Sequence, residues 1–153
     1  MEHSKFGDDF NVGDIFTTAA ITMTESHVVS WAGLTMDFYP LHMDKEYAAR
    51  SQFGERLVHG PLIFAMSVGL VASAGFAGDS AIAWLGVNNM RMLAPVKIGD
   101  TITVAVKVIE KSPTSDPKKG IQVWQYSVTN QRGEKVMQHD YKMMFHMRGE
   151  VDA

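Results

Sequence analysis

The chain of 153 residues contains no cysteine. Disulfide bonds, thiolate nucleophiles and cysteine-bound metal centres are therefore excluded. A chain without cysteine is compatible with a reducing compartment, and we expect a cytoplasmic protein. Proline is also sparse, with 5 residues, so each proline is a strong local signal for a turn or a helix start.

Long runs of one charge are missing as well. The formal net charge is −3, and the densest basic spot is the pair Lys118 and Lys119, in a segment typical of a turn. We therefore expect no nucleic-acid partner. The N-terminal segment is polar and acidic and lacks the apolar centre of a signal peptide.

One uncharged stretch, residues 61–77, has to be considered as a membrane span. Its length is at the short limit for a transmembrane helix, and it contains glycine and serine residues. A helix buried on all sides within a globular fold is the better interpretation, so we expect no membrane association.

The length predicts a single domain over residues 1–153, with a flexible N-terminus at 1–10. The first half predicts short strands at 12–24, then helices at 24–34, 45–50 and 60–74. The second half predicts an apolar segment at 81–93 and strands at 101–108, 121–129 and 136–145. One long apolar helix with several antiparallel strands is an α+β pattern, in which a curved sheet can bury the helix.

Asp37 and His42 are the most informative pair of residues, because Pro40 lies between them. Proline fixes its own φ and disfavours a helical conformation at Tyr39, so the chain should turn sharply here. A bent loop can direct the carboxylate and the imidazole at one small volume. Such a pair can hold a water molecule, remove a proton from it and deliver a proton elsewhere.

The sequence His59-Gly60-Pro61 precedes a long apolar run and predicts a helix start. The backbone N–H groups at such a start can receive an oxyanion, so Gly60 is a candidate binding position. Gly60 also has a packing alternative, namely close contact where a side chain would not fit. We expect His59 to shape the helix start rather than to react.

Asp37 can also have a purely local role as a turn-capping side chain, and His42 alone could be an ordinary packed or surface histidine. Asp37, His42 and His59 are suitable metal-ligand types as well. Their spacing matches no strong metal signature, so we expect no metal site.

The combined motifs resemble the signature of the MaoC-like family, whose usual sequence is Gly-Asp-x-Asn-Pro-x-His. Asp37, Pro40 and His42 fit this pattern, whereas Met36 replaces the usual glycine and Tyr39 the usual asparagine. Further similarities are found at Asp44, Tyr47-Ala48-Ala49, Phe53-Gly54, His59-Gly60 and in the segment from Gly86 to Asp100.

The resemblance implies a hotdog fold, with a curved antiparallel sheet wrapped around a long central helix. It also implies reversible hydration of a 2-enoyl thioester, with Asp37 and His42 as the general acid/base pair and Gly60 N–H on the thioester carbonyl. The implied substrate is an acyl-CoA thioester, no further cofactor is required, and the implied assembly is a homodimer.

Tyr39 is the main departure from the family pattern, and it could narrow the pocket or add a polar contact to substrate. The serine that some hydratases carry about eight residues after the glycine is not evident, because Val68 stands there and Ser67 is adjacent. Two alternatives therefore stay open. One is an acyl-CoA thioesterase, and the other is a non-catalytic subunit that binds acyl thioesters.

Overall fold

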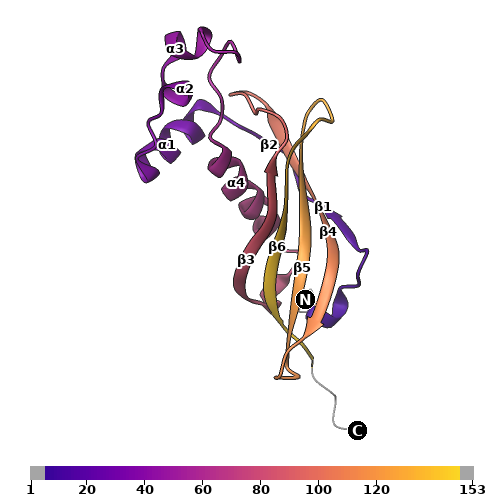
Figure 1. The fold of residues 1–153 in the computed structure, drawn as a ribbon. Helices are drawn as coiled ribbons and strands as arrows, with labels where there is room; N and C mark the ends of the chain where they lie inside the picture. The colour runs from indigo at the N-terminus through magenta and orange to yellow at the C-terminus, as the bar shows by residue number, and fades with distance from the viewer. Residues whose placement is uncertain (1–5, 149–153) are drawn as a thin grey trace.

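The computed structural model describes residues 6–148. A six-stranded antiparallel sheet has the order β1-β4-β5-β6-β3, and β2 also pairs with β4 (Figure 1). The strands are β1 (Ile15–Thr17), β2 (Ile21–Thr22), β3 (Ala81–Met92), β4 (Thr101–Pro113), β5 (Lys119–Asn130) and β6 (Lys135–His146). The helices are α1 (Glu25–Thr35), α2 (Pro40–Met43), α3 (Lys45–Ala49) and α4 (Gly60–Ser73), with 3-10 turns η1 (Gly7–Asp9) and η2 (Gly78–Ser80).

The core lies between α4 and the inner face of the sheet. Leu62, Ile63 and Val71 of α4 pack in one apolar cluster with inward-facing residues of β4, β5 and β6, among them Trp124 and Tyr126. Period-2 alternation in β4 supplies one wall of this cluster, because alternate side chains of a strand face the same side. The predicted α+β arrangement is confirmed.

The sequence predicted a helix that is buried on all sides. In the structure, α4 also has an exposed flank. Leu62, Ile63, Ser67 and Val71 are buried, whereas Gly69, Ala72 and Ser73 are exposed. Its uncharged sequence therefore covers an exposed flank as well as a core face. Within residues 6–148, no helix has the length and apolarity needed to cross a membrane.

The expectation of a flexible segment over residues 1–10 is wrong for its second half. Phe10 is 1% exposed, and its ring meets Trp124 at 5.0 Å between centroids. The side-chain amide of Gln122 donates a hydrogen bond to the carbonyl of Gly7 (2.7 Å). One aromatic side chain thus anchors η1 to the sheet, and residues 1–5 lie outside the described part of the chain.

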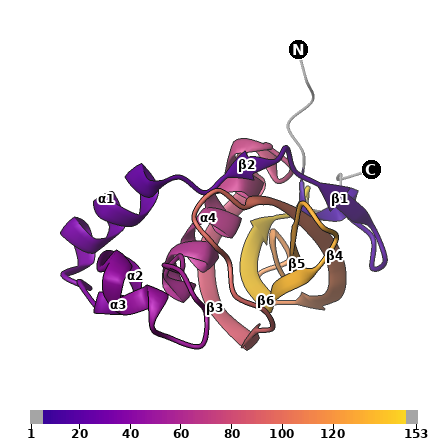
Figure 2. The ribbon, with the colours of Figure 1, turned by 90° about the horizontal axis from the view of Figure 1, so that it is seen from above.

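The helices α1, α2 and α3 form a lobe that extends from one end of the sheet (Figure 1). Viewed from above, α4 lies between this lobe and the strands (Figure 2). The strand β3 forms one edge of the sheet, and its pairing with β6 is interrupted by three register shifts. The first turn of α4 therefore lies where the lobe, the helix and the sheet edge meet.

Candidate active site

Asp37 lies in the short loop between α1 and α2. Met36 ends α1 in the left-handed conformation, with φ of 64°. The Asp37 carboxylate accepts a hydrogen bond from the backbone N–H of Tyr39 (3.3 Å), so the turn-capping role is real. Its side chain is still 41% exposed, and the second carboxylate oxygen, Oδ2, points toward His59. One side chain can therefore hold the turn and face the site at once.

His42 lies on α2, which begins at Pro40 as the sequence predicted. Its Nδ1 donates a hydrogen bond to the carbonyl of Leu57 (2.8 Å). Because a carbonyl only accepts, Nδ1 carries the proton and Nε2 of the neutral ring is left as an acceptor. Burial lowers the pKa of His42, with a smaller effect in the same direction from His59, while Leu57 and Asp37 act in the opposite direction. The lowered pKa favours the neutral ring, in which Nε2 can accept a proton.

His59 is the residue that immediately precedes α4, and its side chain is fully buried. Its Nε2 donates to the backbone carbonyl of Asp37 (3.0 Å) and lies 3.9 Å from Asp37 Oδ2. Its ring also lies against the ring of His42, with centroids 3.9 Å apart and 30° between planes. The predicted role at the helix start is therefore part of a larger one, since His59 contacts both candidate catalytic residues.

Asp37 and His42 were expected to converge because of the bent loop, and His59 lies beside both of them. One ligand-type atom from each of Asp37, His42 and His59 lies within 4.8 Å of the others. As potential metal ligands they are unequal, because the Nε2 of His59 is already bonded to the Asp37 carbonyl. A metal ligated through Nε2 would have to displace that hydrogen bond, whereas Nδ1 of His59 has no hydrogen-bond partner among the described residues.

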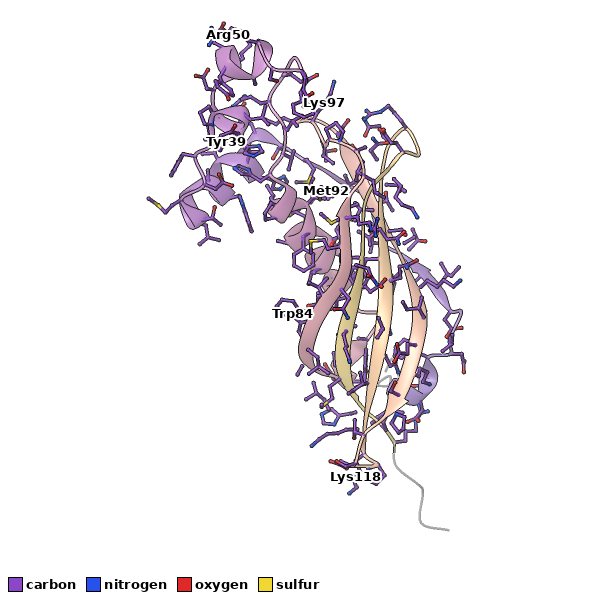
Figure 3. The ribbon with its side chains drawn as sticks, in the orientation of Figure 1. Tyr39, Arg50, Trp84, Met92, Lys97 and Lys118 are labelled. Carbon is purple, nitrogen blue, oxygen red and sulfur yellow. The ribbon has the colours of Figure 1, made fainter. Side chains whose placement is uncertain are left out.

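An open groove of about 350 Å³ leads to His42 and Gly60. Its other walls are apolar and come from the loop before α4, from α4 itself and from the segment after β3; they are Phe53, Leu57, Val58, Ile63, Met92, Leu93, Ala94, Pro95 and Val96. In Figure 3, Met92 lies at the end of β3 that is nearest the lobe. Sequence reasoning missed this wall, although the family-like segment from Gly86 to Asp100 contains most of it.

The segment that forms this wall is held by Asp100, which is 4% exposed. Its carboxylate accepts hydrogen bonds from Arg132 (2.8 Å), Gln131 (2.7 Å) and the backbone N–H of Lys97 (2.9 Å). Burial raises the pKa of Asp100, but these donors outweigh it and lower the pKa to about 2. Asp100 is therefore a charged anchor for the groove wall at all ordinary pH values.

Gly60 is the first residue of α4, so its N–H has no acceptor within the helix. A Cβ built on Gly60 would meet its nearest heavy atom, Met92 Sδ, at 3.6 Å, which is an ordinary contact. The chain itself therefore leaves room for a side chain at this position. The packing explanation for this glycine is weakened, whereas close approach of a ligand to the N–H remains a reason for it.

Tyr39 flanks the site but is not among the residues that line the groove. Its ring lies 6.1 Å from His42 and 6.3 Å from Tyr47, and it is 54% exposed (Figure 3). A hydrogen bond with the Tyr47 side chain raises the pKa of Tyr39. Ser67, the other residue weighed from the sequence, is buried against His139 on the sheet and does not reach the groove.

The chain is similar to known proteins in sequence and in fold. The family described as MaoC like domain matches residues 10–130. Protein MaoC of Klebsiella aerogenes is 36% identical over 135 residues, which are 84% of this chain and 40% of that protein. The (R)-specific enoyl-CoA hydratase of Rhodospirillum rubrum is 38% identical over 90 residues, which are 58% of this chain and 60% of that enzyme.

Among solved structures, an Archaeoglobus protein described as a monoamine oxidase regulatory protein superposes with a TM-score of 0.87 at 33% identity, covering 93% of this chain and 94% of that one. Hotdog proteins are found among the structural neighbours, so the predicted hotdog fold is confirmed. The chain spans less than two thirds of the length of Protein MaoC and of the Rhodospirillum hydratase.

Proposed function

The chain belongs to the MaoC-like domain family, and we propose that it is a hydro-lyase that reversibly adds water to the double bond of a 2-enoyl thioester. The observation that carries this proposal is the convergence of Asp37 and His42 beside a groove that also contains Gly60. The family relationship supports hydration of enoyl-CoA in general terms. The residue roles below are our assignment.

Both members of the pair are proton acceptors in the resting site. Asp37 presents a carboxylate oxygen, and His42 presents the free Nε2 of a ring whose Nδ1 is bonded to Leu57. A water between them can donate one hydrogen to each, which aims its lone pair at the β-carbon of the substrate. As the C–O bond forms, the pair takes a proton from the water and returns a proton to the α-carbon. The site is thereby restored.

Negative charge moves onto the thioester oxygen during this attack. We assign the Gly60 N–H as the donor to that oxygen, since it is a free donor at the N-terminus of α4. A single preorganised donor of this kind can be worth about 3–4 kcal/mol in the transition state. The reaction requires no metal or redox cofactor, and the thioester handle would be coenzyme A or acyl-carrier phosphopantetheine.

The proposed assembly is a homodimer. In the described part of the chain, β3 is an edge strand with one side unpaired, and Trp84 (Figure 3) is exposed on it. Leu85 and Met90 of the same strand are also exposed. An exposed apolar edge of this length favours pairing with another strand. Light scattering is expected to give twice the mass of the chain at micromolar concentration, and a stable monomer would contradict this part of the proposal.

A panel of 2-enoyl-CoA thioesters with straight, branched and dicarboxylic acyl chains tests the activity. We expect loss of the enoyl absorbance without release of free CoA thiol. Thiol release instead would show the thioesterase, in which the same water attacks the carbonyl carbon. Binding of the thioesters with neither change would show a non-catalytic subunit. The three outcomes are separated in one experiment with two readouts.

A further inference from the structure

His59 has no catalytic duty in the mechanism above, yet it is a fully buried titratable residue that contacts both Asp37 and His42. Its Nε2 carries the ring proton, because the partner at 3.0 Å is the carbonyl of Asp37. Its Nδ1 is buried and has no hydrogen-bond partner among the described residues. His139 shares this unpaired nitrogen, so what distinguishes His59 is its contact with the Asp37 carbonyl and with the His42 ring.

Two contacts of His59 act on two different groups. The Nε2–H bond fixes the backbone at Asp37, 22 residues earlier in the chain, against the start of α4. The face of the ring supports His42, whose own Nδ1 is held by Leu57 from another direction. The carboxylate and imidazole are thus located by one side chain at the position next to Gly60.

We propose that His59 is the positioning residue of this site, which holds the Asp37 backbone through its Nε2–H and the His42 ring through its face. This inference rests on the proposed function for its kinetic consequences only. The geometric part concerns the resting protein and can be tested without substrate.

The stack also affects how His42 binds protons. The ring of His59, with its centroid 3.9 Å from that of His42, acts to lower the pKa of His42. The charged or titratable side chains that act on His42 are His59, which lowers its pKa, and Asp37, which raises it; Tyr39 lies at its edge. Without His59, His42 should protonate at higher pH.

Two variants separate the two contacts. His59→Phe keeps a flat ring against His42 but removes the donor to Asp37, whereas His59→Gln keeps a donor near Nε2 but removes the ring. We expect His59→Phe to lower kcat by about 10–100-fold, as is typical when a group that orients a reacting residue is removed. His59→Gln should recover part of that loss. KM should change little, because neither contact is with substrate.

The matched control is His139→Phe. Within residues 6–148, His139 is the other fully buried histidine with an unpartnered Nδ1, and its neighbours there are Ser67, Phe64, Tyr126 and Tyr141 rather than Asp37 or His42. His139→Phe shows how replacing a buried histidine by phenylalanine changes stability away from the site. We expect its kcat to stay within about twofold of wild type. Melting temperatures of all three variants identify any loss of folded protein.

The decisive measurement is an NMR titration of the His42 ring in the protein without substrate, which is independent of enoyl-CoA turnover. The pKa of His42 should rise in both His59 variants and stay unchanged in His139→Phe, and the acid limb of kcat/KM should move the same way. An unchanged His42 titration in folded His59→Phe would overturn the proposal. If His59→Phe and His59→Gln lose kcat equally, and in proportion to their loss of stability, His59 has only a packing role.

Discussion

The helix α4 has a buried histidine at its start and another against its middle, and the two can be compared directly. His59 and His139 are both 0% exposed, and both leave Nδ1 without a partner in the described part of the chain. Each donates through Nε2, His59 to the Asp37 carbonyl and His139 to the Ser67 hydroxyl oxygen (3.0 Å), since the Ser67 hydroxyl itself donates to Phe64. The tautomer is the same, and the surroundings differ.

At the middle of α4 the surroundings are closed. Phe64, Tyr126 and Tyr141 surround His139 with ring centroids at 4.9, 4.7 and 6.1 Å. Burial lowers the pKa of His139 to about 4, against a weaker opposite effect of Asp140. At the start of α4 the neighbours are a second histidine and a carboxylate that is 41% exposed beside a groove. Two buried histidines with the same tautomer therefore have different neighbours: His139 lies in a closed aromatic cluster, and His59 borders the groove and the proposed acid/base pair.

The largest effect is expected from substituting Asp37 and His42, the candidate acid/base pair beside the start of α4. Asp37→Asn and His42→Ala should each lower kcat by about 10²–10⁴-fold on an accepted enoyl thioester, because each removes a proton acceptor. The double variant should lose much less than the product, since the two groups act on one water. Steady-state kinetics and thermal melts measure this, and melting temperatures should change little.

Asp116→Asn is the matched control for Asp37→Asn. Asp116 also accepts a hydrogen bond from the backbone N–H two residues later, Lys118, but it lies at the tip of the β4–β5 hairpin. It should keep the wild-type kcat. If Asp37→Asn and His42→Ala both keep near-wild-type turnover, the pair is structural and the binding-subunit alternative gains support.

The next effect concerns the anion-binding role of Gly60. Gly60→Val should lower kcat by about 10²–10³-fold, the loss typical for an oxyanion donor that becomes inaccessible. Gly69→Val is its control, because Gly69 lies on the exposed flank of the same helix and a Cβ there meets nothing within 4 Å. Full turnover of a folded Gly60→Val protein would rule out close approach of a thioester oxygen to this N–H.

The closed region should show its effect in the pH dependence of stability. The pKa of His139 is about 4 in the folded protein and about 6.5 for an exposed histidine, so between these pH values the unfolded chain binds one more proton than the folded chain. The contribution of neutral His139 to the free energy of unfolding is fully present above about pH 6.5. It is lost as the pH falls toward 4, by about 3 kcal/mol in total. Urea titrations at several pH values should show this slope flattened in His139→Phe. An unchanged slope would mean that other groups dominate it.

The sequence predicted that Asp37 and His42 face one small volume, because Pro40 between them is a local signal for a turn. It could not predict the stack of His42 on His59, which depends on how α4 packs against the lobe. Burial of Phe10 was missed for the same reason: its partner Trp124 is far away in the chain. The exposed flank of α4 could not be predicted either, because an uncharged helix has no charged residues in its sequence that mark which face is exposed.

Met36 gives the smallest expected effect, and it concerns the loop that carries Asp37. A non-glycine residue at φ of 64° pays about 1–2 kcal/mol for the left-handed conformation, which explains why glycine is usual at this place in the family pattern. Met36 is 76% exposed, so its side chain contributes little packing in return. Glycine also loses more chain entropy on folding, which offsets part of the gain.

Met36→Gly should therefore stabilise the protein by about 0.5–1 kcal/mol and raise the melting temperature by about 2 °C. Leu34→Gly, two residues earlier and 81% exposed, is the control. It lies inside α1, where glycine should destabilise by about 1 kcal/mol. Opposite signs for the two substitutions in thermal melts would confirm strain at Met36, and the same sign for both would contradict it. Turnover of Met36→Gly should stay near wild type, because His59 holds the Asp37 carbonyl independently of Met36.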